Sequence, residues 1–139
     1  KETDFVEDEK TTEENRIIDL TQISGPFQIN KSEYKLGEKI FLHVGGLQNT
    51  EKGEIIFGRP INDTEFKSYA EIPFDGFKKS SFNQYIEIEL LKSRGVCNTE
   101  DLIGTWILWF KGTIYPSIEF EVIDEIIGGH EIEFSESVC

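Results

Sequence analysis

The chain contains two histidines, the residues best suited to acid–base chemistry near neutral pH. A hydrolytic triad also needs a nucleophile and a group that orients the base. His43 lies within the alternating segment 40–44, where it is expected to point outward from a strand, and His130 follows a Gly-Gly pair. No Gly-x-Ser-x-Gly motif accompanies them. We therefore predict no catalytic residue and a protein that is not an enzyme.

Metal-binding patterns are also missing from the sequence. A copper site built from two histidines and a cysteine often adds a methionine, and the chain has none. Calcium prefers oxygen ligands gathered in loops. Segment 62–65 forms one acidic loop and Asp75 lies in another, but the spacing is not that of an EF-hand. We predict no metal and no cofactor, and we retain a calcium- or carbohydrate-binding surface module as an alternative function.

The charge balance limits the classes of partner. The formal net charge is −13, which disfavours nucleic acid and anionic membrane surfaces, because both attract clustered lysine and arginine. No apolar run approaches the roughly 20 residues of a membrane-spanning helix. The expected partners are therefore proteins, either copies of the chain itself or other surface proteins, with no nucleic acid and no membrane insertion.

Two cysteines and two sequons indicate the compartment. Cys97 lies in a polar segment and Cys139 is the last residue, so a disulfide between them is predicted to close the C-terminal tail onto that segment, with two free thiols as the alternative. Asn30 and Asn62 begin Asn-x-Ser/Thr triplets and are candidate glycosylation sites. Together these features favour an extracellular or cell-surface location.

The most apolar stretch is 104–112, which carries both tryptophans between two glycines. Its residue types predict a central strand buried on both faces. Trp106 and Trp109 are three positions apart, so they must point to opposite faces of that strand. Trp109 shares its face with Ile107. We predict either that this face is covered within the domain or that it is an exposed patch for a partner or a sugar.

Other short segments alternate between apolar and polar residues. The expected strands are 27–29, 40–44, 54–57, 69–74, 82–90, 105–111 and 118–122. Segment 34–39 is predicted to be a turn. Pro73 cannot donate a ladder hydrogen bond, so 69–74 is expected at a sheet edge. Gly128-Gly129 predicts a two-residue hairpin that adds a C-terminal strand over 130–136, with Ile132 and Phe134 facing the core.

The order of these segments resembles a known sandwich. The piece Tyr34-Lys-Leu-Gly-Glu-Lys-Ile-Phe-Leu-His-Val44 is followed much later by Gly104-Thr-Trp-Ile-Leu-Trp-Phe110 and Ile118-Glu-Phe-Glu-Val122. This layout resembles the Ig-like domains of secreted prokaryotic surface proteins, of the macroglobulin and fibronectin types. The resemblance implies an all-β fold, an Ig-like antiparallel β-sandwich of about seven to nine strands with an extra C-terminal hairpin strand. It implies a binding or structural role.

Two regions follow from these patterns. Residues 1–23 are predicted to be an acidic N-terminal arm, and 24–139 the Ig-like β-sandwich. Segment 16–23 is an apolar stretch that is expected either to form a first strand or to add a strand to a neighbouring sheet. The predicted function is a non-catalytic extracellular structural or interaction subunit, associating through its sandwich and terminal strands as a filament subunit or as an accessory subunit of a surface complex. The candidate interface residues are Ile17, Ile18, Leu20, Ile23 and Trp109.

Overall fold

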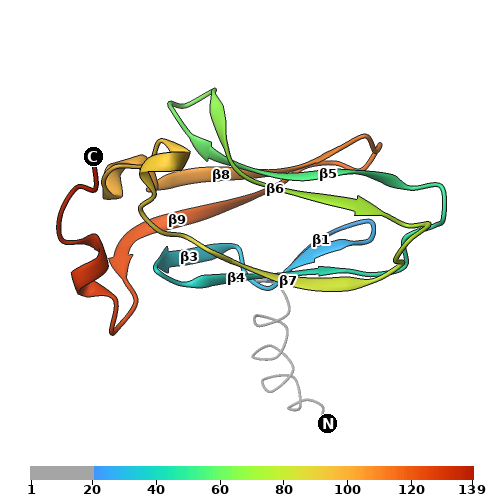
Figure 1. Ribbon diagram of the computed structural model, residues 1–139, viewed down its shortest axis with the longest axis horizontal. Coiled ribbons are helices and arrows are strands. Elements are labelled where there is room, and N and C mark those ends of the chain that lie inside the picture. The colour runs from blue at the N-terminus through green and yellow to red at the C-terminus, as the bar shows by residue number, and fades with distance from the viewer. Residues whose placement is uncertain (1–20) are drawn as a thin grey trace, which may run out of the picture.

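Two β-sheets pack face to face in the computed structural model, which describes residues 21–139 (Figure 1). The four-stranded sheet has the order β1 (Gln22–Ser24), β2 (Phe27–Ile29), β4 (Lys39–Val44) and β7 (Phe82–Glu87). The five-stranded sheet has the order β3 (Glu33–Leu36), β9 (Ile118–Ile126), β8 (Gly104–Lys111), β5 (Lys52–Pro60) and β6 (Phe66–Asp75). The prediction of an all-β sandwich of about seven to nine strands is confirmed. In residues 21–139 no helix is long and apolar enough to span a membrane.

Alternation along the strands places the core between the sheets. Phe27 of the four-stranded sheet stacks on Phe110 of the five-stranded sheet, with 4.1 Å between the ring centroids. Trp106 is fully buried, and its indole N–H donates a 2.7 Å hydrogen bond to the carbonyl of Leu102. The core therefore joins residues from both sheets, and the buried tryptophan has its one polar atom paired.

Strand β8 is central, as predicted, because it pairs with β9 on one side and β5 on the other. The prediction that it is buried on both faces is wrong. Trp106, Leu108 and Phe110 point into the core, whereas Trp109 is 48% exposed on the outer face. The structure is a two-layer sandwich, so each sheet has one face in the core and one face outside it.

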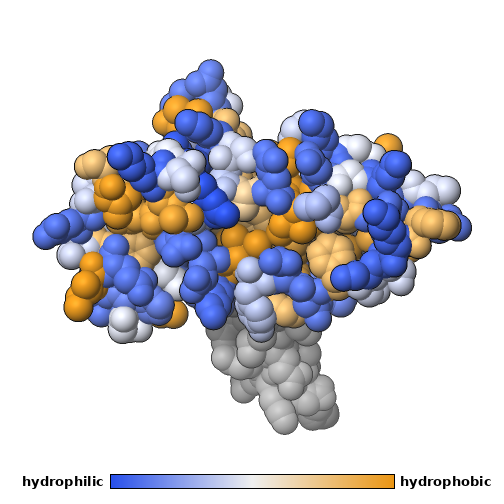
Figure 2. Space-filling view, viewed as in Figure 1, coloured by the Kyte–Doolittle hydropathy of each residue, from blue (hydrophilic) through white to orange (hydrophobic). Residues whose placement is uncertain are grey.

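The edges of the two sheets meet along β6 and β7. The prediction that the strand with Pro73 lies at an edge is confirmed, since β6 ends the five-stranded sheet. The Tyr69 hydroxyl on β6 donates toward the carbonyl of Glu87 and accepts the N–H of Glu89, which joins this edge to the opposite sheet. Figure 2 shows this side of the molecule, where apolar side chains gather between the two sheets and hydrophilic ones flank them.

The predicted C-terminal hairpin strand is not formed. Three short 3-10 helices follow β7: η1 (Lys92–Arg94), η2 (Thr99–Asp101) and η3 (Glu131–Phe134). The last of them occupies the place of the expected strand. Strand β3 lies beside residues 121–126 of β9 and β8 beside residues 118–122, and the segment after β9 pairs with neither edge. It forms a helical turn instead, and the tail then reaches Cys97, where the N–H of Val138 donates to the Cys97 carbonyl. Phe134 is buried as expected, but Ile132 is 88% exposed, because the helical turn breaks the alternation.

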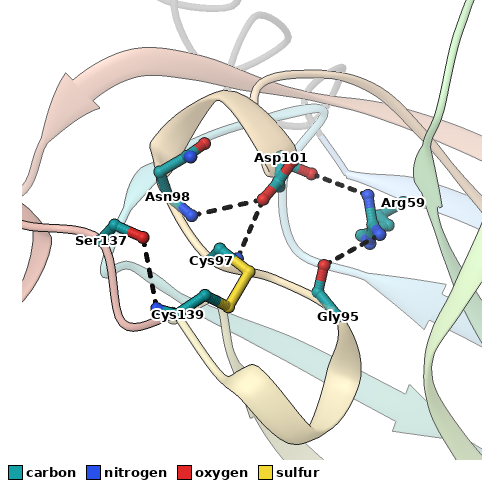
Figure 3. Close-up of a disulfide and its surroundings, with 7 residues drawn as sticks. All are labelled: Arg59, Gly95, Cys97, Asn98, Asp101, Ser137 and Cys139. Carbon is teal, nitrogen blue, oxygen red and sulfur yellow. Dashed lines mark hydrogen bonds between the residues drawn. A yellow bond between two sulfur atoms is a disulfide. The ribbon is translucent and has the colours of Figure 1, made fainter.

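The predicted disulfide between Cys97 and Cys139 is present, with 5.2 Å between the Cα atoms (Figure 3). The Asp101 carboxylate accepts the N–H groups of Cys97 and Asn98 at 2.9 and 3.3 Å, which fixes the segment that carries Cys97. The buried guanidinium of Arg59 on β5 donates to the carbonyls of Gly95 (3.2 Å) and Asp101 (3.4 Å). The C-terminal tail is therefore attached to a segment that is itself anchored to the five-stranded sheet.

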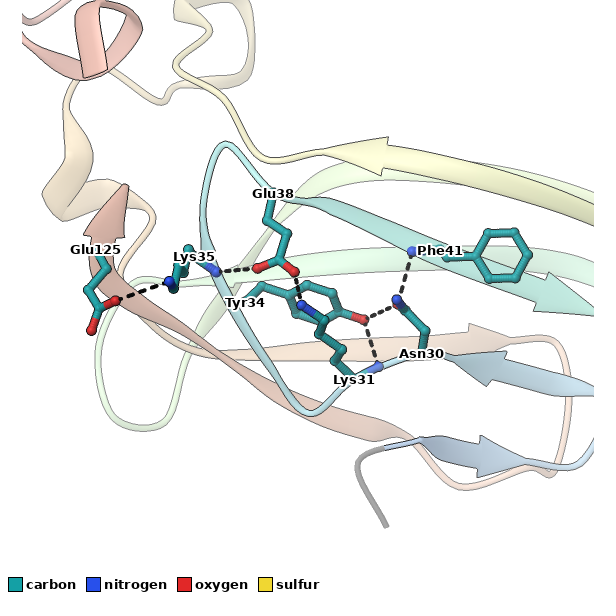
Figure 4. A network of polar contacts seen from close by, with 7 residues as sticks. All are labelled: Asn30, Lys31, Tyr34, Lys35, Glu38, Phe41 and Glu125. Atoms are coloured by element: carbon teal, nitrogen blue, oxygen red, sulfur yellow. Dashed lines mark hydrogen bonds and ion pairs between the residues drawn. The ribbon is translucent and has the colours of Figure 1, made fainter. Parts of the chain in front are cut away.

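Segment 34–39 contains a strand, contrary to the predicted turn. Residues 33–36 form β3, which runs parallel to β9, and Tyr34 and Leu36 are buried. The chain crosses from one sheet to the other just before β3 (Figure 4). At this crossing the Tyr34 hydroxyl donates to Asn30 Oδ1 (2.8 Å) and accepts the N–H of Lys31 (3.1 Å). The same Asn30 oxygen accepts the N–H of Phe41 on β4 (3.2 Å), so the crossing is fixed to both sheets.

Burial of Tyr34 makes the stability of the chain depend on pH in the alkaline range. Burial raises the pKa of the phenol well above its ordinary value. The unfolded chain then loses this proton at lower pH than the folded chain. The stabilisation is fully present below about pH 10 and falls by roughly 1.4 kcal/mol per pH unit above it, until the folded phenol ionises.

Urea unfolding between pH 8 and pH 11.5 measures this loss. Tyr34→Phe is expected to be about 1 kcal/mol less stable than the parent at pH 8, because it lacks the hydroxyl bonds. It is expected to lose less stability on going to pH 11. Tyr69 remains in the variant, and burial raises the pKa of that phenol too, so part of the slope persists. If the free energy of unfolding fell equally with pH in the parent and in Tyr34→Phe, the alkaline loss of stability would not come from Tyr34.

Candidate functional site

The strongest candidate for a functional surface is the outer face of the five-stranded sheet around Trp109. The pairing register places Trp109 on β8 beside Ile56 on β5, and Ile107 beside Gly58. These residues alternate with core residues, so they point away from the other sheet. The surface forms a shallow groove of about 490 Å³, called here the Trp109 groove. Its lining residues are Ile56, Gly58, Phe66, Lys67, Ser68, Ile107, Trp109 and Ser117.

Gly58 lets the side chains of Ile107 and Phe66 pack closely onto the backbone of β5. A Cβ atom at this position would lie 2.8 Å from Cγ2 of Ile107 and 3.2 Å from Cβ of Phe66. The pairing of β5 with β6 also shifts register between Phe57 and Gly58, which is a β-bulge. A glycine within a strand often indicates a β-bulge or a place where another group approaches the backbone closely. The sequence analysis did not identify this position, and the glycine within the strand is the signal that could have indicated it.

The lining of the Trp109 groove suits apolar binding better than catalysis. Lys67 is the only lining residue with an ionisable side chain, so the groove holds no acid–base pair. Trp109, Ile107 and Ile56 offer an aromatic ring and aliphatic surface at adjacent strand positions. Burying such a surface against a partner removes apolar area from water, which is the main driving force of association.

The two histidines do not meet. His43 lies on the outer face of the four-stranded sheet, as expected, and its Nδ1 is 2.5 Å from Asn83 Oδ1. His130 precedes η3, and its Nδ1 is 3.0 Å from the Glu133 carboxylate. Each ring thus has a local structural partner, and the structure brings neither of them to the Trp109 groove.

The two acidic loops weighed for calcium lie at opposite ends of β6. Asp63 precedes this strand and Asp75 ends it. The Asp75 carboxylate accepts the N–H of Phe77 (3.0 Å), and Asn62 Oδ1 accepts the N–H groups of Thr64 and Glu65. Within residues 21–139, no group of three or more His, Cys, Asp or Glu side chains is placed to hold a metal ion. The oxygens of these loops therefore stabilise their own turns.

The remaining predicted site residues are spread over the surface. Asn30 and Asn62 are exposed, as a glycosylation acceptor must be. Ile23 is 67% exposed on β1, which pairs with β2 of its own sheet. The expected interface residues Ile17, Ile18 and Leu20 lie outside the described residues.

Comparison of the chain with protein families, with curated proteins and with solved structures finds no match.

Proposed function

We propose that this chain is a non-catalytic Ig-like association domain of an extracellular assembly, and that it binds a protein partner through the Trp109 groove. The observation that carries the proposal is the half-exposed Trp109, flanked by Ile56 and Ile107 on the outer face of a sheet. Tryptophan is over-represented among the residues that dominate binding energy at protein interfaces. A groove without an acid–base pair favours binding over chemistry.

The strand order supports the Ig-like part of the proposal. In Ig-like sandwiches strands B and E share one sheet and strands C, F and G the other, with C′ added beside C in some types. Here β4 and β7 share one sheet, and β6, β5, β8 and β9 are neighbours in the other. The first strand is divided, with β2 antiparallel to β4 and β3 parallel to β9. This order fits the macroglobulin- and fibronectin-type domains that the sequence resembles.

A protein partner fits the groove better than a sugar. Sugar sites combine an aromatic platform with polar groups that bond the hydroxyls. The positions beside Trp109 on β5 and β8 are Ile56, Gly58 and Ile107, which offer no side-chain hydrogen bonds. The polar side chains of the lining are Lys67, Ser68 and Ser117, and the Ser68 hydroxyl already donates to Glu71. The carbohydrate alternative is therefore the weaker one. The disulfide and the two exposed sequons support an extracellular location.

A second copy of the chain is the partner that the surrounding charges favour. The outward register places Glu71 beside Ile56, Glu119 beside Ile107, and Lys111 two residues after Trp109. A two-fold pairing of identical faces can oppose Lys111 of one copy to an acidic residue of the other. Because each copy carries a formal charge of −13, salt that screens this repulsion is expected to strengthen the association.

Sedimentation velocity over a concentration series tests the proposal. Trp109→Thr is expected to weaken self-association by about thirtyfold, the loss typical of a binding hot spot, and to change the free energy of unfolding by less than about 1 kcal/mol. Tyr85→Thr is the matched control. Tyr85 is a 62% exposed aromatic residue on the outer face of the other sheet, and its replacement is expected to leave association unchanged.

Two results would contradict the proposal. One is a parent chain that stays monomeric at about 100 µM in high salt. At that concentration a binding free energy of roughly −5 kcal/mol would already give detectable dimer. The other is equal weakening by Trp109→Thr and Tyr85→Thr. Loss of association only on removal of residues 1–20 would favour strand exchange through the N-terminal segment instead.

A further inference from the structure

A second groove lies between the edge strands of the two sheets, away from Trp109. It has a volume of about 850 Å³ and opens between β6 and β7. We call it the lysine groove. Its lining residues are Lys52, Gly53, Glu54, Ile72, Pro73, Phe74, Asp75, Lys78, Lys79, Phe82, Gln84, Lys111 and Gly112.

The charge of this groove is opposite to that of the chain. Four lysines line it against two carboxylates, whereas the chain as a whole has a formal net charge of −13. The lysines come from β5, from the β6–β7 connection and from β8, and the pairing of Lys52 with Asp75 and of Glu54 with Lys111 brings them to one end of the sandwich. The fold therefore brings lysines from three separate segments of an acidic sequence into one positively charged groove.

The floor of the lysine groove is apolar. Ile72, Phe74 and Phe82 contribute to it from the two edge strands. The Lys79 ammonium lies 5.9 Å from the centre of the Phe82 ring, so positive charge and aromatic surface are adjacent. Figure 2 shows apolar side chains between the sheets on this side, with hydrophilic residues around them. A matching ligand is an acidic segment that also carries an apolar residue.

We infer that the lysine groove binds the acidic N-terminal segment 1–15 of the same chain. This segment contains seven acidic residues against two lysines, and its only apolar side chains are Phe5 and Val6. Phe5 is the side chain expected to match the apolar floor, and the neighbouring Asp4 and Glu7 supply carboxylates that match the lysines. The lysine groove shares no lining residue with the Trp109 groove, although its Lys111 lies two residues after Trp109 on β8.

The connection is long enough for the segment to reach its own groove. Strands β1 and β7 are the two edges of the four-stranded sheet. Three strand spacings separate them by about 14 Å. Residues 16–21 can span up to about 20 Å when extended. An intramolecular segment also acts at an effective concentration of about a millimolar, far above the micromolar concentration of a second copy in a dilute solution.

Carbodiimide cross-linking of the full-length chain tests the inference, since the reagent joins carboxylates to lysine amines in contact. An equal mixture of ¹⁴N- and ¹⁵N-labelled chains at about 2 µM, well below the effective concentration of a tethered segment, separates cross-links within a chain from those between chains. Mass spectrometry is expected to find carboxylates of 1–15 joined to the groove lysines at least about fivefold more often than to the exposed Lys35 and Lys92, all within one isotope label. The yield of these cross-links is expected to fall severalfold in 1 M NaCl, because the Debye length is then about 3 Å and the attraction between the segment and the lysines is screened.

A double variant removes part of the positive charge. In Lys78→Gln/Lys79→Gln, cross-links from 1–15 to the remaining Lys52 and Lys111 are expected to fall at least about threefold, because the lost charges held the segment in place. The double variant Lys35→Gln/Lys92→Gln is the matched control and is expected to leave these cross-links unchanged. All four positions are exposed, so folding is preserved in both.

Three results would overturn the inference. They are cross-links spread evenly over all lysines, cross-links mainly between heavy and light chains, and equal yields in the two double variants. The second result would assign the groove to the arm of another copy. Trp109→Thr is expected to leave the cross-links to Lys52, Lys78 and Lys79 unchanged, because these lysines have no part in the proposed contact between copies. Failure of the proposed self-association and failure of this inference are therefore separate outcomes.

Discussion

Replacing Trp106 by alanine is expected to lower the free energy of unfolding by about 4 kcal/mol, the largest effect of any single substitution considered for this chain. Trp106 is fully buried, packs edge-on against Tyr69 with 5.2 Å between ring centroids, and stacks on Phe120 at 5.7 Å. Alanine leaves a cavity among these rings. It also leaves the carbonyl of Leu102 without the indole N–H that it accepts at 2.7 Å.

Guanidinium unfolding monitored by circular dichroism measures this loss. Trp106→Phe keeps most of the volume but not the N–H, and about half of the destabilisation is expected. Trp109→Ala is the matched control, three residues further along the same strand, and the expected loss is below about 1 kcal/mol because the side chain is half exposed. Similar losses of unfolding free energy in Trp106→Ala and Trp109→Ala would contradict the placement of Trp106 in the core and Trp109 on the outer face.

Removing the disulfide by the double substitution Cys97→Ser/Cys139→Ser is expected to cost about 3 kcal/mol of stability. The bond closes a loop with a sequence separation of 42 residues, which restricts the unfolded chain. In the folded chain the N–H of Val138 donates to the carbonyl of Cys97 at 2.9 Å, and this contact depends on the tail staying in place. The variant is therefore expected to lose protection at the tail as well as global stability.

Urea unfolding with and without a reducing agent separates these effects. The reductant is expected to lower the stability of the parent chain to that of the double variant, and to leave the variant unchanged. Hydrogen exchange is expected to show faster exchange at Val138 in the variant under native conditions. A reductant that does not alter the parent would show that the disulfide contributes nothing to stability.

Local alternation was sufficient to predict most of the strands. The alternation of Ile86, Ile88 and Leu90 with glutamates identified the segment around β7, and Pro73 identified an edge. The two errors in assigning strands both concern contacts between residues far apart in the sequence. Residues 33–36 form a strand because β9 lies beside them. Residues 131–134 form a helical turn instead of a strand, and the tail that follows is joined to the distant Cys97. No local pattern carries that information.

The candidate surface was predictable only in part. The spacing of Trp106 and Trp109 showed that one of them would leave the core, and Ile107 was correctly placed on the face of Trp109. The contributions of Ile56 and Phe66 follow from the register of β5 with its neighbours. The lysine groove was not predictable, because its charges lie far apart in a sequence whose composition is strongly acidic.

The parallel pairing of β3 with β9 has a consequence for the order of folding. Glu33 lies beside Glu121, so the five-stranded sheet cannot close at this edge until almost the whole chain has been synthesised. Such non-local pairing slows folding to milliseconds or longer, roughly the range of all-β domains. Until then β8 lacks its β9 neighbour, Trp106 lacks Phe120, and Cys97 has no partner thiol. A nascent chain that stops before β9 therefore exposes both an unpaired strand edge and a reactive cysteine.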